Sequence, residues 1–268
     1  MKYLDLFTGI GGFTLGIGDK ANCIGFSEID KYAAKVYQHH FPTHHNYGDI
    51  TLINETELPD FDLLVGGFPC QSFSIAGKRG GFNDTRGTLF FDIARILRTK
   101  KPRLFLLENV KGLLSHDNGD TFKTIISTLD ELGYDLQWQV LNSKNHGVPQ
   151  NRERIFIVGH LRGTSRPEVF PFGSDAENSN EGNSTEQRRE IGAALTVRSA
   201  GGQNCRGNYE IIDSKIRRLT PTECERLQGF PDGWTSVENT SDSQRYKMCG
   251  NAVTVNVIKD IMEKLLTP

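Results

Sequence analysis

The sequence contains no apolar run that approaches the ~20 residues of a membrane-spanning helix. Its first residues, MKYLDLFTG, lead straight into strand-like sequence without the pattern of a signal peptide. The five cysteines are scattered and none belongs to a CxxC pair, which argues against a disulfide framework and against a zinc site. We therefore expect a cytoplasmic protein with reduced thiols and no bound metal.

Two nucleotide-binding signatures are also missing. The first glycine-rich stretch, FTGIGG, lacks the GxGxxG spacing of dinucleotide-binding folds and the P-loop spacing that ends in Gly-Lys-Ser or Gly-Lys-Thr. These absences disfavour NAD and ATP. They favour a nucleoside cofactor without a pyrophosphate, of which S-adenosylmethionine is an example.

The chain does contain alternating strand-like and helix-like segments. Its 268 residues, 37% of them hydrophobic and 24% charged, are enough for one soluble domain with a sizeable core, or for one domain with a small insert. Strand-like segments occur at about 2–7, 23–28, 61–68, 103–109, 134–143 and 153–161, and a further short strand is expected to end near residue 50. The pattern predicts a doubly wound, mostly parallel Rossmann-like α/β sheet, in which the last two strands are antiparallel.

Polar or reactive side chains follow four of the expected strands. Since ligands of open α/β sheets bind beyond the carboxyl ends of the strands, Glu28, Asp49, Cys70 and Glu108 are candidate site residues. Glu28 lies nineteen residues beyond Gly9, the offset at which an acid binds ribose hydroxyls, and Asp49 can accept a hydrogen bond from an exocyclic amine. A lone surface glutamate would explain Glu28 by itself, and a simple tight turn would explain the glycine loop by itself. Polar or reactive side chains at four successive strand ends are less expected by chance.

Cys70 follows a proline and opens a polar, glycine-rich loop. Residues 66–107 carry eight Lys and Arg but only two Asp and Glu, although the net charge of the whole chain is −2, so a polyanionic substrate is plausible. Nearby arginines favour a Cys70 thiolate as nucleophile. Glu108 would need a raised pKa in order to donate a proton.

Six motifs, in this order, resemble those of the C5 cytosine DNA methyltransferases, and most closely the compact bacterial restriction-modification type. They are DLFTGIGGF, GGFPCQSFS, ENV, QNRERIFIVG, RLTPTECERLQGFP and GNAVTVNV. The resemblance covers the whole chain except about residues 161–190. It implies a catalytic and cofactor-binding domain over 1–160, a small, mainly β and coil target-recognition region with a low-complexity loop over 161–244, and a C-terminal segment over 245–268 that returns to the catalytic domain.

The resemblance also implies the reaction. Cys70 would attack C6 of a cytosine, so that C5 becomes a nucleophile toward the methyl group of S-adenosylmethionine. Glu108 would protonate or hydrogen-bond N3, Arg154 would hold O2, and Arg152 would support the thiolate or a phosphate. The implied cofactor-binding residues are Phe7, Gly9, Ile10, Gly11, Glu28, Ile29, Asp49, Ile50, Pro69, Leu89, Asn251 and Val253.

The implied partner is double-stranded DNA, from which the target base must flip out to be reached. Gln71 would fill the vacated space while Lys78, Arg79 and Arg86 hold phosphates. The expected base or backbone contacts of the recognition loop are Arg198, Gly201, Gly202, Gln203 and Arg206. The short recognition region suggests a short or relaxed target.

The resemblance leaves alternatives open. A tRNA cytosine-5 methyltransferase would use the same chemistry on RNA, and a silent family member would bind DNA without catalysis. Motif spacing and an intact Cys70, Glu108 and Arg154 favour the DNA enzyme. We expect a monomer in a bacterial or phage-infected cytoplasm, with any cognate restriction endonuclease acting separately.

Overall fold

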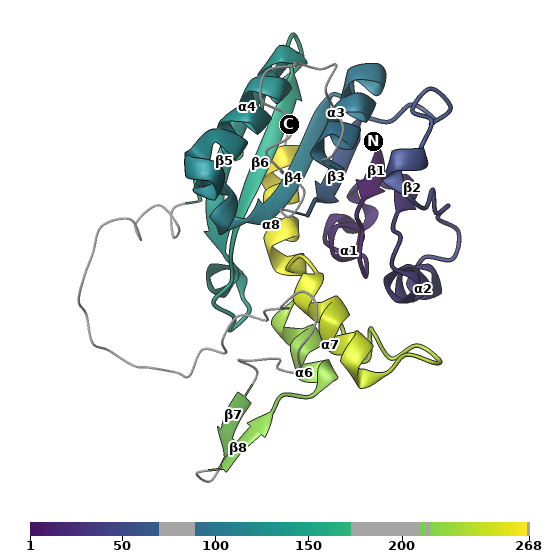
Figure 1. The fold of residues 1–268 in the computed structure, drawn as a ribbon, viewed down its shortest axis with the longest axis vertical. Coiled ribbons are helices and arrows are strands. Elements are labelled where there is room, and N and C mark those ends of the chain that lie inside the picture. Colours follow the sequence, from purple (N-terminus) through teal and green to yellow (C-terminus); the bar gives the residue numbers. More distant parts are fainter. Residues whose placement is uncertain (70–88, 173–208, 213–214, 267–268) are drawn as a thin grey trace, which may run out of the picture.

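The structure is a computed structural model that describes residues 1–69, 89–172, 209–212 and 215–266 (Figure 1). Its centre is a six-stranded sheet. In spatial order the strands are β2 (Asn22–Ser27), β1 (Lys2–Leu6), β3 (Leu63–Gly67), β4 (Leu104–Val110), β6 (Glu153–Leu161) and β5 (Tyr134–Asn142).

Strands β2, β1, β3 and β4 are parallel to one another, whereas β6 is antiparallel to both β4 and β5. The carboxyl ends of the four parallel strands and the first residues of β6 therefore lie at one edge of the sheet. The chain passes from β1 to β2 on one side and then returns to β3 on the other, so the order reverses between β1 and β3. Such a switch point opens a crevice for ligands.

Helices cover both faces of the sheet. On one face pack α3 (Leu89–Lys100) and α4 (Asp120–Glu131), and on the other pack α1 (Gly12–Ile17) and α8 (Val255–Leu266). Neighbouring strand residues alternate between the two cores, as Leu104 and Phe105 do, because successive side chains of a strand point to opposite faces. This arrangement confirms the predicted doubly wound sheet and its antiparallel last pair.

Helix α1 packs closely on α8 because two of its positions are glycine. A Cβ atom on Gly12 would lie 2.7 Å from Cγ1 of Val253, and one on Gly16 would lie 2.6 Å from Cβ of Ile258. The C-terminal segment therefore lies directly against the helix that follows the first glycine loop.

The other elements lie around these layers. Three of them are α-helices: α2 (Lys31–His40), α6 (Pro221–Leu227) and α7 (Asp242–Asn251). Strands β7 (Tyr209–Ile212) and β8 (Lys215–Arg218) form a hairpin. The short 3₁₀ helices are η1 (Gly18–Lys20), η2 (Ile50–Leu52), η6 (Lys111–Leu114), η7 (His116–Gly119) and η8 (Ser143–His146). Phe230 and Trp234, which follow α6, pack with Ile10 and Val36 of the α/β layers. No helix in the described ranges is long and apolar enough to cross a membrane.

The prediction of a short strand that ends near residue 50 is wrong. Asn46 forms only an isolated parallel bridge with Phe26, and Ile50–Leu52 is a 3₁₀ helix. The side chain of Asp49 caps this helix by accepting a hydrogen bond from the Thr51 amide. Local side-chain capping therefore replaces the strand pairing that the sequence suggested.

Candidate active site

The glycine loop after β1 is held in an unusual backbone conformation. Phe7, Gly9 and Gly11 have φ angles of 54°, 57° and 90°. The Gly9 amide donates to Oε2 of Glu28 at 2.8 Å, so the predicted ribose-binding acid contacts the loop directly. The structure thus brings the end of β1 and the end of β2 together.

Glu28 is held by a second hydrogen bond, because its Oε1 accepts from the Asp30 amide at 2.7 Å. Burial raises the pKa of Glu28, although the bonds from Asp30 and Gly9 oppose this change. The next residue, Ile29, is 72% exposed, which leaves an apolar surface beside a polar one. An adenosine has a matching arrangement, because the flat face of its base suits the apolar surface and its ribose hydroxyls suit the carboxylate.

Asp5 lies beneath the loop and is a residue that the sequence analysis missed. Its carboxylate is buried within β1 and accepts hydrogen bonds from Oγ1 of Thr8 at 2.6 Å and of Thr14 at 2.9 Å. Burial raises the pKa of Asp5 to about 7. The acid ties the glycine loop and α1 to the sheet. An acid followed by Thr at the third and ninth positions is the only sequence signal for this contact.

The other predicted cofactor residues differ in their surroundings. Asp49 uses its Oδ1 to cap Thr51 at 2.9 Å, and Ile50 is 2% exposed and belongs to the core beneath α3. Leu89 is partly buried against the same core, whereas Pro69, which follows β3, is exposed. Ile50 therefore belongs to the hydrophobic core under the candidate cofactor site and does not line its surface.

The C-terminal pair arrives beside the glycine loop from a distant part of the sequence. Asn251 ends α7 with an exposed side chain, and Val253 packs against Gly12 at the start of α1. Ile10 is buried, and its carbonyl accepts a hydrogen bond from Nε1 of Trp234 at 2.8 Å. These contacts hold Val253 and Trp234 against the glycine loop and the start of α1.

Glu108 and Arg154 form an ion pair on neighbouring strands. Nε of Arg154 lies 3.0 Å from Oε1 of Glu108, and the two side chains are 20% and 12% exposed. Burial raises the pKa of Glu108, although the positive charges of Arg154 and Arg152 oppose this change. A Cβ on Gly67 would lie 3.0 Å from Oε2 of Glu108, so this carboxyl sits directly over the end of β3.

Arg152 is placed differently from Arg154. It is buried, and its guanidinium donates to the carbonyls of Gly250 at 3.2 Å and Ala252 at 2.8 Å. Burial, together with the nearby Arg154, lowers the pKa of Arg152 to about 9. Arg152 thus connects the start of β6 to the C-terminal segment.

Asn109 is a second residue that the sequence analysis did not single out. Its buried side chain donates to the carbonyl of Phe68 at 2.8 Å and accepts from the Val110 amide at 2.8 Å. Phe68 comes two residues before Cys70, so Asn109 fixes the backbone that leads to the predicted nucleophile. The motif ENV was the available signal, but it gave Asn109 no role.

Several predicted residues lie outside the described ranges. They are the nucleophile Cys70 and the DNA contacts Gln71, Lys78, Arg79, Arg86, Arg198, Gly201, Gly202, Gln203 and Arg206. The described residue next to the nucleophile is Pro69, which follows β3 at the same edge as Glu108 and Arg154.

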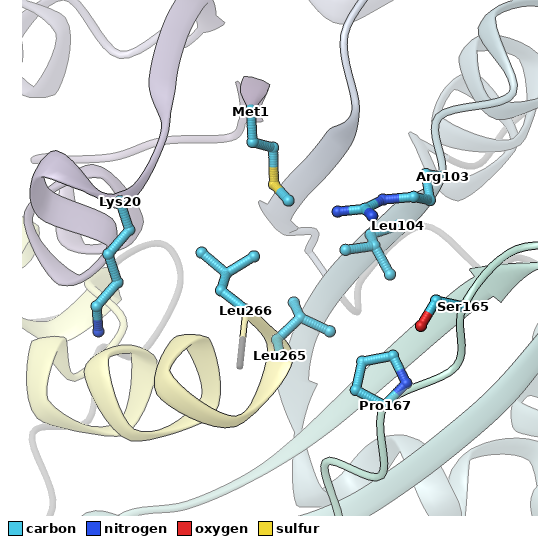
Figure 2. Close-up of a pocket in the computed structure, with 8 residues that line it drawn as sticks. All are labelled: Met1, Lys20, Arg103, Leu104, Ser165, Pro167, Leu265 and Leu266. Atoms are coloured by element: carbon cyan, nitrogen blue, oxygen red, sulfur yellow. The ribbon is translucent and has the colours of Figure 1, made fainter. Parts of the chain in front are cut away.

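A pocket of about 320 Å³ lies elsewhere, at the opposite edge of the sheet (Figure 2). Met1, Arg103 and Leu104 line it next to Leu265 of α8, and Leu104 is the first residue of β4. Since the residues that line the pocket include no predicted site residue, it is separate from the candidate active site.

Solved structures show the class of protein that this fold defines. The match to a DNMT2 variant from Spodoptera frugiperda has a TM-score of 0.78 at 22% identity and covers 99% of each chain. The match to the Dnmt2 methyltransferase of S. pombe has a TM-score of 0.77 at 18% identity and covers 99% of this chain and 98% of that one. This chain therefore shares its fold with these two structures.

The family follows from sequence comparison. The model of the C-5 cytosine-specific DNA methylases matches residues 1–188 and 171–267. Type II methyltransferase M1.ScrFI of Lactococcus lactis subsp. cremoris is 42% identical over 99% of this chain and 78% of its own length, and M.HhaI of Haemophilus parahaemolyticus is 38% identical over 97% and 93%. The chain belongs to the C-5 cytosine-specific DNA methylase family, which catalyses cytosine methylation in DNA, and the predicted resemblance is confirmed.

Proposed function

We propose that this protein transfers a methyl group from S-adenosylmethionine to C5 of a cytosine in double-stranded DNA. The observation that carries the proposal is the half-buried ion pair of Glu108 and Arg154, 3.0 Å apart, beside the strand end that leads to Cys70. In a member of this methylase family, such a pair is suited to hold N3 and O2 of one cytosine ring.

The residues around the switch point fit the cofactor. The glycine loop brings backbone amides to the crevice, and Glu28 offers carboxylate oxygens beside the exposed Ile29. We assign the ribose hydroxyls to Glu28, the adenine to Ile29 and Asp49, and the methionine portion to the loop from Phe7 to Gly11. When bound, S-adenosylmethionine supplies an electrophilic methyl group on a sulfonium.

Cys70 and Glu108 would divide the activation of the ring between them. The Cys70 thiolate forms a bond to C6 while Glu108 gives its proton to N3, which lets C5 form its bond to the methyl group. Loss of the C5 proton to solvent and return of the N3 proton to Glu108 then let the C6–sulfur bond break, so that the Cys70 thiolate leaves and the aromatic ring is restored. The raised pKa of Glu108 supports this role, because a protonated carboxyl is the form that can donate.

Access to the ring requires the cytosine to leave the duplex. A thiolate and a sulfonium cannot reach opposite faces of a stacked base, so the base must flip out at a cost of a few kcal/mol. We assign Gln71 to the vacated space, and Lys78, Arg79 and Arg86 to the phosphates on the basis of their residue types.

We assign sequence readout to the segment around Arg198, Gln203 and Arg206 and propose that the target is short or relaxed, as the small recognition region suggests. The chain would act as a monomer in a bacterial cytoplasm, with any cognate endonuclease acting separately. Bisulfite mapping of plasmid DNA from cells that express the protein would define the target. A unique six-base-pair site would contradict a relaxed target.

The proposed function is tested by incubating the protein with tritiated S-adenosylmethionine and either duplex DNA or tRNA. We expect label in cytosines of DNA. Label only in tRNA would identify an RNA enzyme, and label in neither would identify a family member without catalysis. Either of these results would overturn the proposal.

A further inference from the structure

We propose that Tyr246, on α7, is a positioning residue for target recognition. It fixes the base of the β7–β8 hairpin to the same helix that contacts the catalytic strands. The inference rests on the proposed function, because it specifies how the recognition region is held for DNA binding.

Tyr246 contacts two consecutive residues at the base of the hairpin. Its hydroxyl donates to the carbonyl of Leu219 at 2.6 Å, and the guanidinium of Arg218 lies 3.7 Å from the centre of its ring. Strand β8 ends at Arg218, and Thr220 caps α6. One side chain therefore binds the junction at which the hairpin becomes the helix that packs on the α/β layers.

The hairpin depends on this junction for its orientation. Within the described ranges, β7 and β8 pair with each other in a separate two-stranded sheet, and Figure 1 shows this sheet projecting away from the central one, beyond α6 and α7. A lone two-stranded hairpin is only marginally stable in water, so contacts at its base determine its direction. In the sequence, the segment with Arg198, Gln203 and Arg206 leads directly into β7.

Helix α7 is bonded both to α6 and to the α/β layers, and so provides a fixed support for Tyr246. The guanidinium of Arg245 donates to the buried Glu225 at 3.1 Å, and Nζ of Lys247 donates to Asp30 at 2.7 Å. At the end of the helix, the carbonyls of Gly250 and Ala252 accept from Arg152. Tyr246 therefore connects the hairpin to a helix that is tied to both the cofactor edge and the catalytic strands.

Two substitutions separate the contacts of Tyr246. Tyr246→Phe removes the hydrogen bond to Leu219 and keeps the ring beneath Arg218, whereas Tyr246→Ala removes both contacts. Tyr32→Phe is the matched control, because Tyr32 is a second tyrosine at the edge of the same apolar cluster. Initial rates of methylation would be measured on unmethylated plasmid DNA at saturating S-adenosylmethionine.

We expect Tyr246→Phe to raise KM for DNA about fivefold, the size of one net hydrogen bond. Tyr246→Ala should raise it by roughly tenfold or more, since the ring contact with Arg218 is also lost. The kcat at saturating DNA and the affinity for S-adenosylhomocysteine should stay within about twofold of wild type, because α7 keeps its other bonds. Bisulfite mapping should show more methylation outside the main target in the Ala variant.

A Tyr246→Ala variant that melts like wild type and matches Tyr32→Phe in KM and fidelity would overturn the inference. If Tyr246→Ala does not fold, Tyr246→Phe and Arg218→Met decide the matter, and an unchanged KM in both overturns it equally. Wild type is assayed in parallel. If wild type fails to methylate DNA, the proposed function fails, whereas an active wild type with unaffected Tyr246 variants refutes only this inference.

Discussion

The two halves of the sheet hold their functional groups in different ways. In the half formed by β2, β1 and β3, the glycine loop is fixed by carboxylates that accept from backbone amides and hydroxyls, as Glu28 and Asp5 do. In the half formed by β4, β6 and β5, full charges of opposite sign face each other, as Glu108 and Arg154 do.

Strand direction explains this difference. Parallel strands place loops next to one another at their carboxyl ends, and these loops present backbone amides, as Gly9 does. The antiparallel β6 places its first residues beside the last residues of β4, where Val110 pairs with Arg154 in the register. This geometry brings the charged side chains of Glu108 and Arg154 together. Variants in one half should therefore affect cofactor binding, and variants in the other half should affect transfer.

The largest effect should come from Glu108→Gln. The amide keeps a hydrogen-bonding shape but cannot give a proton to N3, so kcat should fall by about 10²–10⁴-fold. The affinity for S-adenosylhomocysteine, measured by calorimetry, should stay within about twofold. A Glu108→Gln variant that keeps wild-type kcat, or whose affinity for S-adenosylhomocysteine falls as much as its kcat, would contradict a functional difference between the two halves of the sheet.

The pH profile sharpens the same comparison. Burial raises the pKa of Glu108, and the protonated form is the proposed donor, so kcat should fall as pH rises above that pKa. The residual activity of Glu108→Gln should lack this alkaline decline. A decline of the same steepness in both proteins would assign it to another group.

In the cofactor half, Glu28→Ala should weaken S-adenosylhomocysteine binding by about 10- to 100-fold, because it removes the carboxylate that accepts from Gly9 and that we assign to the ribose. At saturating S-adenosylmethionine, kcat should recover to within several fold of wild type. Calorimetry and initial rates measure the two quantities. A kcat that stays low at saturation would contradict the assignment.

Asn109→Ala should reduce kcat about tenfold. It removes the hydrogen bond to the Phe68 carbonyl and leaves that buried acceptor without its partner, at a cost of roughly 1–3 kcal/mol. Asn109→Asp keeps the shape but loses the donor, so it should be equally impaired. Single-turnover rates check this, and an Asp variant as active as wild type would show that the donor is not needed.

The smallest effect concerns Asp5 and folding. Its folded pKa of about 7 is above the usual carboxyl value, so its contribution to stability is present at low pH and is lost as pH rises toward 7. The slope from this group is at most about 1.4 kcal/mol per pH unit. Asp5→Asn should flatten the decline between pH 5 and pH 7 in urea unfolding. An unchanged slope would mean that Asp5 is ionised in the fold.

Local patterns in the sequence predicted most of the sheet and placed Glu28 at the end of a strand, but the hydrogen bond from Gly9 to Glu28 was not predicted. Glu108 and Arg154 were predicted as site residues, although the register that brings them to 3.0 Å was not. The missing strand near residue 50 shows a limit of this reasoning, because Asp49 forms a local cap with Thr51 instead.

Long-range contacts were beyond prediction from one sequence. Asn109 binds a carbonyl 41 positions away, and the Arg152 guanidinium reaches carbonyls 98 and 100 positions away. Such bonds depend on where the layers meet and leave no periodic pattern. In the sequence, Asp5 resembles an ordinary strand residue. Its partners Thr8 and Thr14 reach it only when the glycine loop and α1 pack on the sheet.

The central claim is that Cys70 forms a covalent bond to a flipped-out cytosine. Its most direct test incubates the protein with S-adenosylmethionine and duplex DNA in which 5-fluorocytosine replaces cytosine, followed by mass measurement of the products. Because fluorine cannot leave as a proton does, wild type should be trapped as a methylated protein–DNA adduct, and Cys70→Ser should form none while still binding cofactor. An adduct with Cys70→Ser, or none with a wild type that methylates the unsubstituted duplex, would contradict the account.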